Sequence, residues 1–144
     1  MQTRTTYEIV GGRETFVKLA EAFYARVDKE PVLRSMYPKT LERPIETLTM
    51  FLIQFFGGPA EFNEKHGQPR LKMRHARFKI GQAERDAWMT HMLAAIDEIG
   101  IQEPAKSLMA QYFKDASTFL INQPEEKEAP DILRSTTPGT YTPG

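Results

Sequence analysis

The sequence predicts an all-α fold with about four main helices, and three observations support this prediction. Apolar residues recur at steps of three and four in four separate segments, which is the spacing of one face of a helix. No segment alternates between apolar and polar residues over more than a few positions, as a half-buried strand would. The chain has 144 residues, of which 40% are hydrophobic, and this is enough for one domain with its own core.

The chain is expected to open with a one-turn helix, because Thr5 and Glu8 have the spacing of a capping box. The first long helix is predicted over residues 13–29. Its stripe comprises Phe16, Leu19, Ala20, Phe23 and Val27. Residues 32–36 lie between two prolines and are expected to form a short helical turn.

Three further long helices are predicted over residues 44–56, 82–99 and 104–121. Pro44 is tolerated in the first turn of the helix over residues 44–56. The stripes comprise Ile45, Leu48, Leu52, Phe55 and Phe56; Trp88, Met92, Ala95, Ile96 and Ile99; and Leu108, Met109, Tyr112, Phe113, Ala116, Phe119 and Leu120.

Residues 59–80 are expected to form a long connection, and connections of that length are often functional. Its second half is strongly basic, with Arg70, Lys72, Arg74, His75, Arg77 and Lys79. Apolar residues are interleaved with these cations. We therefore expect something other than simple packing to organise the segment.

The composition excludes several classes of site. Because there is no cysteine, the chain forms no disulfide, Cys-ligated zinc site, iron–sulfur cluster or covalent c-type haem attachment. Basic and acidic residues balance at 19 each, so the net charge argues neither for nor against an anionic partner. No apolar stretch follows the N-terminus, and the run over residues 50–53 is too short for a membrane span. A cytoplasmic domain over residues 1–122 is expected, followed by a flexible Pro-rich tail over residues 123–144.

His75 is the first candidate for chemistry. Imidazole is a common iron ligand, and the surrounding cations would suit the carboxylates of a haem. Two other interpretations stay open: a surface histidine in a basic loop, and a phosphate-binding patch for which Phe78 is the single aromatic neighbour. His66 is expected to be solvated and His91 to be partly buried.

Three aromatic residues carry polar groups that suit a cavity. Trp88 lies on the apolar face of its helix, and its indole N–H needs a partner if the ring is buried. Tyr24 borders the stripe of the first long helix, and Tyr37 lies at a chain bend. Each is either a core aromatic with a solvated polar end or a donor into a cavity, and spacing does not distinguish the two.

The chain also contains an ordered series of short motifs. These are Val10-Gly11-Gly12, Phe23-Tyr24, Val32-Leu33-Arg34 with Met36-Tyr37-Pro38, Met50-Phe51-Leu52 with Gly57-Gly58-Pro59, Pro69-Arg70-Leu71-Lys72-Met73-Arg74-His75, Phe78, Ile80, and Glu84-Arg85-Asp86-Ala87-Trp88. From about Tyr7 to Asn122 the chain thereby resembles the group II truncated haemoglobins. The resemblance implies a truncated globin fold, a two-over-two helical sandwich around a haem.

The resemblance implies that His75 is the proximal ligand of a non-covalent haem b. It makes Tyr24, Tyr37 and Trp88 the distal group, which faces the sixth coordination position of the iron. Leu48 and Phe51 would line the distal side, and either Arg74 or Arg77 would bind the haem propionates. The residues implied to pack on the porphyrin are Met73, Phe78, Ile80 and Met92.

Two positions depart from the family pattern. Pro44 lies one turn before Leu48, where its ring can neither gate a ligand nor donate to it. Phe56 replaces a tryptophan before the second glycine pair, which implies a change in packing.

The function implied is tight, reversible binding of dioxygen, and also of nitric oxide and carbon monoxide. An alternative is an oxidoreductase that uses bound oxygen or peroxide, as a nitric oxide dioxygenase or a peroxidase-like enzyme does, with a separate reductase. A third hypothesis is a haem-free helical scaffold whose residues 70–79 bind an anion. The expected partners are diatomic gases, with no nucleic acid and no membrane, and the expected state is a monomer or homodimer.

Overall fold

The computed structural model describes residues 4–124, and every element within them is a helix, which confirms the all-α prediction. The eight helices are α1 (Thr6–Ile9), α2 (Arg13–Val27), α3 (Pro31–Arg34), α4 (Glu42–Phe55), α5 (Glu61–His66), α6 (Leu71–His75), α7 (Gln82–Glu98) and α8 (Ala105–Phe119). The four long ones match the predicted stripes, with ends displaced by no more than two residues. Most of the predicted tail lies outside the described residues.

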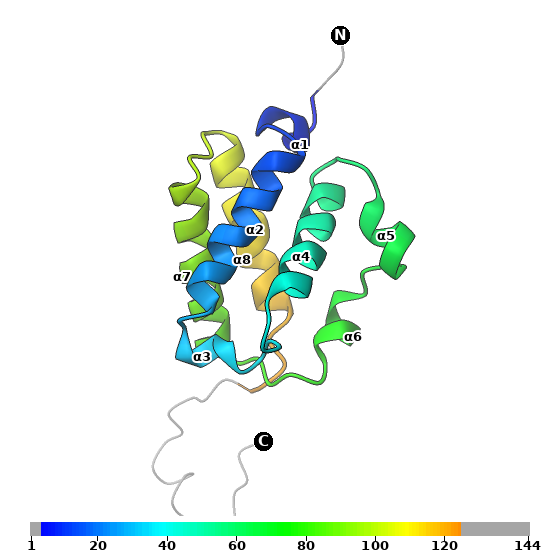
Figure 1. The fold of residues 1–144 in the computed structure, drawn as a ribbon. Helices are drawn as coiled ribbons and strands as arrows, with labels where there is room; N and C mark the ends of the chain where they lie inside the picture. Colours follow the sequence, from blue (N-terminus) through cyan, green and yellow to red (C-terminus); the bar gives the residue numbers. More distant parts are fainter. Residues whose placement is uncertain (1–3, 125–144) are drawn as a thin grey trace, which may run out of the picture.

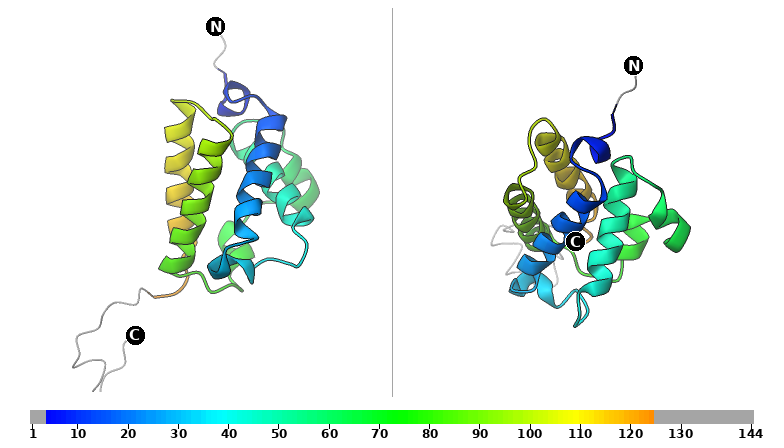
Figure 2. Two further views of the ribbon diagram at one scale, coloured as in Figure 1. Left: turned by 60° about the vertical axis from the view of Figure 1, so that its left-hand side comes forward. Right: turned by 45° about the horizontal axis from the view of Figure 1, so that its top comes forward.

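Two layers of paired helices form a sandwich (Figure 1, Figure 2). In one layer α2 packs against α4, and in the other α7 packs against α8. The layers meet where α2 contacts α7. This is the two-over-two arrangement that the resemblance implied. No helix within residues 4–124 has both the length and the apolar character needed to cross a bilayer.

The core lies between the layers and is built from the predicted apolar faces. Its largest fully buried side chains are Phe16, Leu19, Phe23, Val27, Leu33, Leu52, Ile53, Met92, Ile96, Met109 and Phe113. They recur at helical spacing within the long helices, so the burial of one face of each helix holds the four together.

Helix α1 is held by the predicted capping box. The Thr5 hydroxyl accepts from the Glu8 amide at 3.1 Å, and the Glu8 carboxylate accepts from the Thr5 amide at 2.9 Å. The helix packs on the corner after α4, where a Cβ on Gly58 would lie 2.7 Å from the Ile53 side chain and 2.8 Å from the Tyr7 ring. Only glycine fits at this close approach.

Residues 59–80, predicted as a long connection, contain two short helices that the sequence analysis did not predict, α5 and α6 (Figure 1). Helix α5 is held against α4 through buried Phe62 and a two-way amide contact. In that contact Gln54 Nε2 donates to Asn63 Oδ1 at 3.0 Å, and the Asn63 amide donates to Gln54 Oε1 at 2.9 Å. The groups that hold α5 in place therefore lie on another helix, α4, and the residue spacing within α5 could not reveal them.

Candidate functional site

Two adjoining cavities lie beside α4 and α6. The smaller is also lined by α7 and α8, and the larger also by Tyr24 on α2 and Phe62 on α5. Their volumes are about 440 Å³ and about 140 Å³. Both are lined by Met36, Tyr37, Leu48, Phe51, Leu71 and His75. Because they share these walls, they are compartments of one cleft. The cleft is mostly apolar with a few polar groups, which is the usual character of a small-molecule site.

His75 is the last residue of α6 and lines both compartments. Its Nδ1 is 2.7 Å from the carbonyl oxygen of Leu71, one turn earlier. A carbonyl can only accept a hydrogen bond, so Nδ1 carries the hydrogen and the neutral ring keeps a lone pair on Nε2. A histidine that binds a metal is commonly oriented through its other nitrogen in this way. The ring is therefore prepared for a ligand.

The other two histidines of the sequence do not line these cavities. His91 is partly buried, as predicted, and its Nε2 lies 2.7 Å from a Glu30 carboxylate oxygen. This contact, together with the amide of Val32, lowers the pKa of the Glu30 carboxyl. His66 was expected to be solvated but is half-buried against Phe62. Its Nε2 has no hydrogen-bond partner among the described residues.

The three residues predicted to form the distal group come from three elements and line the same cleft. Tyr24 on α2 lines the larger compartment, Trp88 on α7 lines the smaller, and Tyr37 in the segment after α3 lines both. The two tyrosine rings meet edge to face with their centroids 5.3 Å apart. Trp88 packs on Phe23 and Phe113, with centroid distances of 5.0 and 5.6 Å. The three polar groups therefore belong to one neighbourhood of the cleft.

Burial keeps both distal phenols protonated. It raises the pKa of Tyr24 well above the ordinary value, and the neighbouring Tyr37 raises it further. Burial also raises the pKa of Tyr37, while hydrogen bonds with Tyr24 and Trp88 act in the opposite direction. Both hydroxyls can thus act as donors near neutral pH.

The expected apolar lining is reproduced only in part. Leu48 and Phe51 line both compartments, Phe78 lines the larger and Ile80 the smaller. Met73 and Met92 line neither. Met73 lies on the outer side of α6 with 62% of its surface exposed. Met92 faces the core and is fully buried there. Their positions do not support the expectation that they pack on a porphyrin.

The two arginines expected to bind propionates differ in their surroundings. Arg74 donates to the carbonyl oxygens of His66, Gln68 and Pro69 at 2.7, 3.0 and 2.5 Å. It thereby organises the turn between α5 and α6, although it also lines the larger compartment. Arg77 lies over the ring of Phe78 at the same compartment. Its guanidinium remains available to an anion there.

The sequence analysis missed several lining residues. Arg43 and Thr47 line the larger compartment beside Phe51. These three positions are spaced by four residues on α4, so they share one helical face. That spacing was a usable signal for Arg43. Met36 and Leu71 gave no such signal, because Met36 follows the four-residue α3 and Leu71 begins the five-residue α6, and both helices are too short to show a periodic face.

The cleft fits a haem by three independent criteria. A haem presents a flat apolar macrocycle, a metal that accepts an imidazole, and two carboxylates. The walls of the cleft are largely apolar, and the lone pair on Nε2 of His75 is not used by the protein. Arg43, Arg74 and Arg77 line the larger compartment and supply cations for the carboxylates.

Comparison with known proteins agrees with this geometry. Residues 5–122 match the family model described as bacterial-like globin. The group 2 truncated hemoglobin YjbI of Bacillus subtilis is 31% identical over 122 residues, which cover 85% of this chain and 92% of the relative.

Solved structures give the same result. The hemoglobin of Chloroflexus aurantiacus has 49% sequence identity and a TM-score of 0.83, covering 84% of this chain and 100% of its own. The group II truncated hemoglobin of Bacillus anthracis has 30% identity and a TM-score of 0.86, covering 89% and 98%. The fold, the cleft and these similarities agree, and the chain belongs to the bacterial-like globin family as a truncated haemoglobin of group II.

Proposed function

We propose that this chain holds a non-covalent haem b through His75 and binds dioxygen tightly and reversibly. When bound, haem would supply an iron atom that His75 can ligate and that can take up diatomic gases. The relatives with solved structures are haemoglobins, which supports this function. The observation that carries it is the hydrogen bond from His75 Nδ1 to Leu71, because it leaves Nε2 free where the two compartments meet.

The distal group would hold the gas ligand by hydrogen bonding. Tyr37 lines both compartments, and burial raises its pKa, so its hydroxyl keeps a hydrogen that it can donate to a ligand. A hydrogen bond to a charged group contributes about 1.5–3 kcal/mol, or roughly 10- to 150-fold in a dissociation rate. Slow oxygen release is expected.

The arginines would hold the carboxylates of the haem. Arg77 and Arg43 line the larger compartment without an ion-pair partner among the described residues. Arg74 is bonded to three carbonyl oxygens of the turn before α6, so its first role is to order the segment that presents His75. Apolar residues around the cleft exclude water from the space between these polar ends.

The test is a visible absorption spectrum of the purified protein in the ferric, reduced, oxygenated and carbon monoxide forms. An intense Soret band that shifts with each form is expected. His75→Gly should lose the haem, and free imidazole should restore it by filling the space that the side chain leaves. The control is His66→Gln, which changes a histidine outside the cleft. A protein that stays colourless after haem is added would overturn the proposal.

A further inference from the structure

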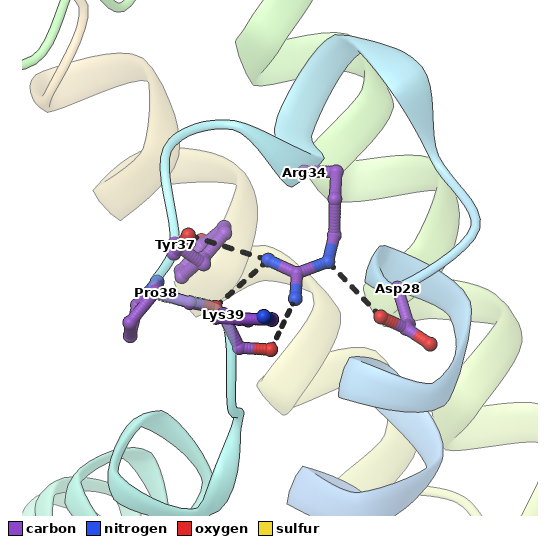
Figure 3. Close-up of polar contacts among 5 residues, drawn as sticks. All are labelled: Asp28, Arg34, Tyr37, Pro38 and Lys39. Carbon is purple, nitrogen blue, oxygen red and sulfur yellow. Dashed lines mark hydrogen bonds and ion pairs between the residues drawn. The ribbon is translucent and has the colours of Figure 1, made fainter.

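Arg34, the last residue of α3, makes four hydrogen bonds with one guanidinium group (Figure 3). Nη1 donates to the carbonyl oxygens of Tyr37 at 3.3 Å and Pro38 at 2.9 Å, and Nη2 donates to that of Lys39 at 2.7 Å. On its other side, Nε donates to a carboxylate oxygen of Asp28 at 3.0 Å. The arginine therefore joins three consecutive carbonyls to one carboxylate.

The three carbonyl groups depend on this arginine. In the part of the chain that the structure describes, no other protein donor reaches the carbonyl oxygens of Tyr37, Pro38 or Lys39. The side chain of Arg34 is 27% exposed, so its aliphatic part is largely covered. A planar group with donors at fixed angles determines the path of the backbone it binds more closely than a single charge does.

The Asp28 side of the contact leads to the other distal tyrosine. Asp28 is the C-cap of α2, and its amide donates to the carbonyl oxygen of Tyr24 at 2.9 Å. Arg34 thus links the end of the helix that carries Tyr24 to the segment that carries Tyr37. The rings of these tyrosines meet edge to face in the cleft. The separation of the two tyrosine rings therefore depends on the contact between Arg34 and Asp28, which lies outside the cavity.

We propose that Arg34 is a positioning residue that sets the place of the Tyr37 hydroxyl, and through it the rate of oxygen release. The inference rests on the proposed function, because it concerns a ligand that Tyr37 holds. Arg34 itself lines neither compartment. It acts by fixing the backbone from which the Tyr37 ring projects.

The test compares arginine with lysine at this position. Arg34→Lys keeps the positive charge, but one ammonium cannot bind Asp28 and three carbonyls together. Oxygen dissociation, measured by stopped flow, should become at least about threefold faster, which is part of the effect of losing a hydrogen bond to the ligand. Arg13→Lys is the matched control. Arg13 forms an ion pair with Glu61 and lies at the other end of α2, so its rate should not change.

A double-mutant cycle separates positioning from general stability. Tyr37→Phe removes the hydroxyl, and Arg34→Lys should have no further effect on oxygen dissociation in that background. The carbon–oxygen stretch of the carbon monoxide complex should shift in Arg34→Lys in the same direction as in Tyr37→Phe, and by less. Loss of stability alone would not move this frequency.

Each outcome decides something. If Tyr37→Phe leaves the rate unchanged, the distal role in the proposed function is wrong. If Tyr37→Phe changes the rate but Arg34→Lys does not, or if the two effects add fully, the inference is overturned. If Arg34→Lys does not fold, Asp28→Ala enters the same cycle, because it removes the carboxylate and thereby breaks only the link to α2. A smaller acceleration is then expected, and a rate and stretch equal to those of the unmodified protein overturn the inference.

Discussion

Trp88 carries the one indole N–H of the chain, and its surroundings fix where that group points. The ring is held between Phe23 and Phe113 and lines the smaller compartment. Trp88→Phe keeps an aromatic ring but removes the donor. We expect oxygen dissociation to become roughly tenfold faster, which corresponds to about 1.5 kcal/mol.

The measurement is stopped-flow release of oxygen, with Tyr7→Phe as the control. Tyr7 packs beside Gly58 at α1 and lines neither cavity, so its loss of a hydroxyl should leave the rate unchanged. An unaltered rate in Trp88→Phe would contradict the role of the indole as a donor.

At the scale of single residues, the sequence revealed which groups have distinctive chemistry and missed which way some side chains face. His75 and the distal group were found because their motifs are specific. Met73 was placed on the porphyrin by the family resemblance. Side chains two residues apart on a helix, however, point in directions about 200° apart. Met73 therefore faces away from the side of α6 that carries His75.

The segment from His75 to Ile80, which follows α6, is held by one side chain from the end of α8. Asn122 accepts from the Ile80 amide at 2.9 Å and donates to the carbonyl oxygens of Phe78 at 2.8 Å and His75 at 3.4 Å. The Asn122 amide also donates to the Ile80 carbonyl at 2.8 Å. α6 has five residues and none of its side chains is buried, so these bonds are a main constraint on it.

Asn122→Ala should therefore loosen the haem. Each lost hydrogen bond is worth about 0.5–1.5 kcal/mol, so haem loss several times faster is expected. Transfer of haem to an excess of an apoglobin acceptor measures the rate. Gln111→Ala, which removes an exposed contact with Asp115 on α8, is the control. Equal transfer rates in the two variants would show that Asn122 does not hold the proximal side.

At the scale of elements, the long helices were predicted from their stripes and α1 from its capping box, whereas α5 and α6 were not predicted. α2, α4, α7 and α8 each carry enough turns to display an apolar stripe. α5 and α6 have six and five residues, too few for a period to be visible and too few to be stable alone. They form because distant groups such as Gln54 bind them.

For the whole molecule, three buried phenols make stability sensitive to alkali. Burial raises the pKa of Tyr112 to about 12, and burial also raises those of Tyr24 and Tyr37 above their ordinary value of 10.0. A raised folded-state pKa means that the unfolded chain loses its protons first. The stabilising contribution is complete below pH 10 and is lost as pH rises through the folded-state values.

The free energy of unfolding should therefore fall between about pH 10 and pH 12, and urea midpoints followed by far-UV circular dichroism would show it. Tyr112→Phe should make the fall shallower, because one of the three phenols is gone. A midpoint that is independent of pH across this range would contradict the burial of these groups.

The hydrogen bonds of Arg34 and those of Asn122 hold opposite sides of the cleft, and they differ in how many residues separate the bonded groups along the chain. The groups that the Arg34 side chain binds lie at most six residues from it, whereas the three groups of the segment after α6 that the Asn122 side chain binds lie 42 to 47 residues away. Closing a long loop costs more entropy than closing a short one. During folding, the corner that carries Tyr37 is thus expected to form from local contacts, and the segment that carries His75 only after α8 has docked. The histidine is then among the last groups to be ordered, and we expect a haem to bind only after the side of the cleft that carries Tyr37 has formed.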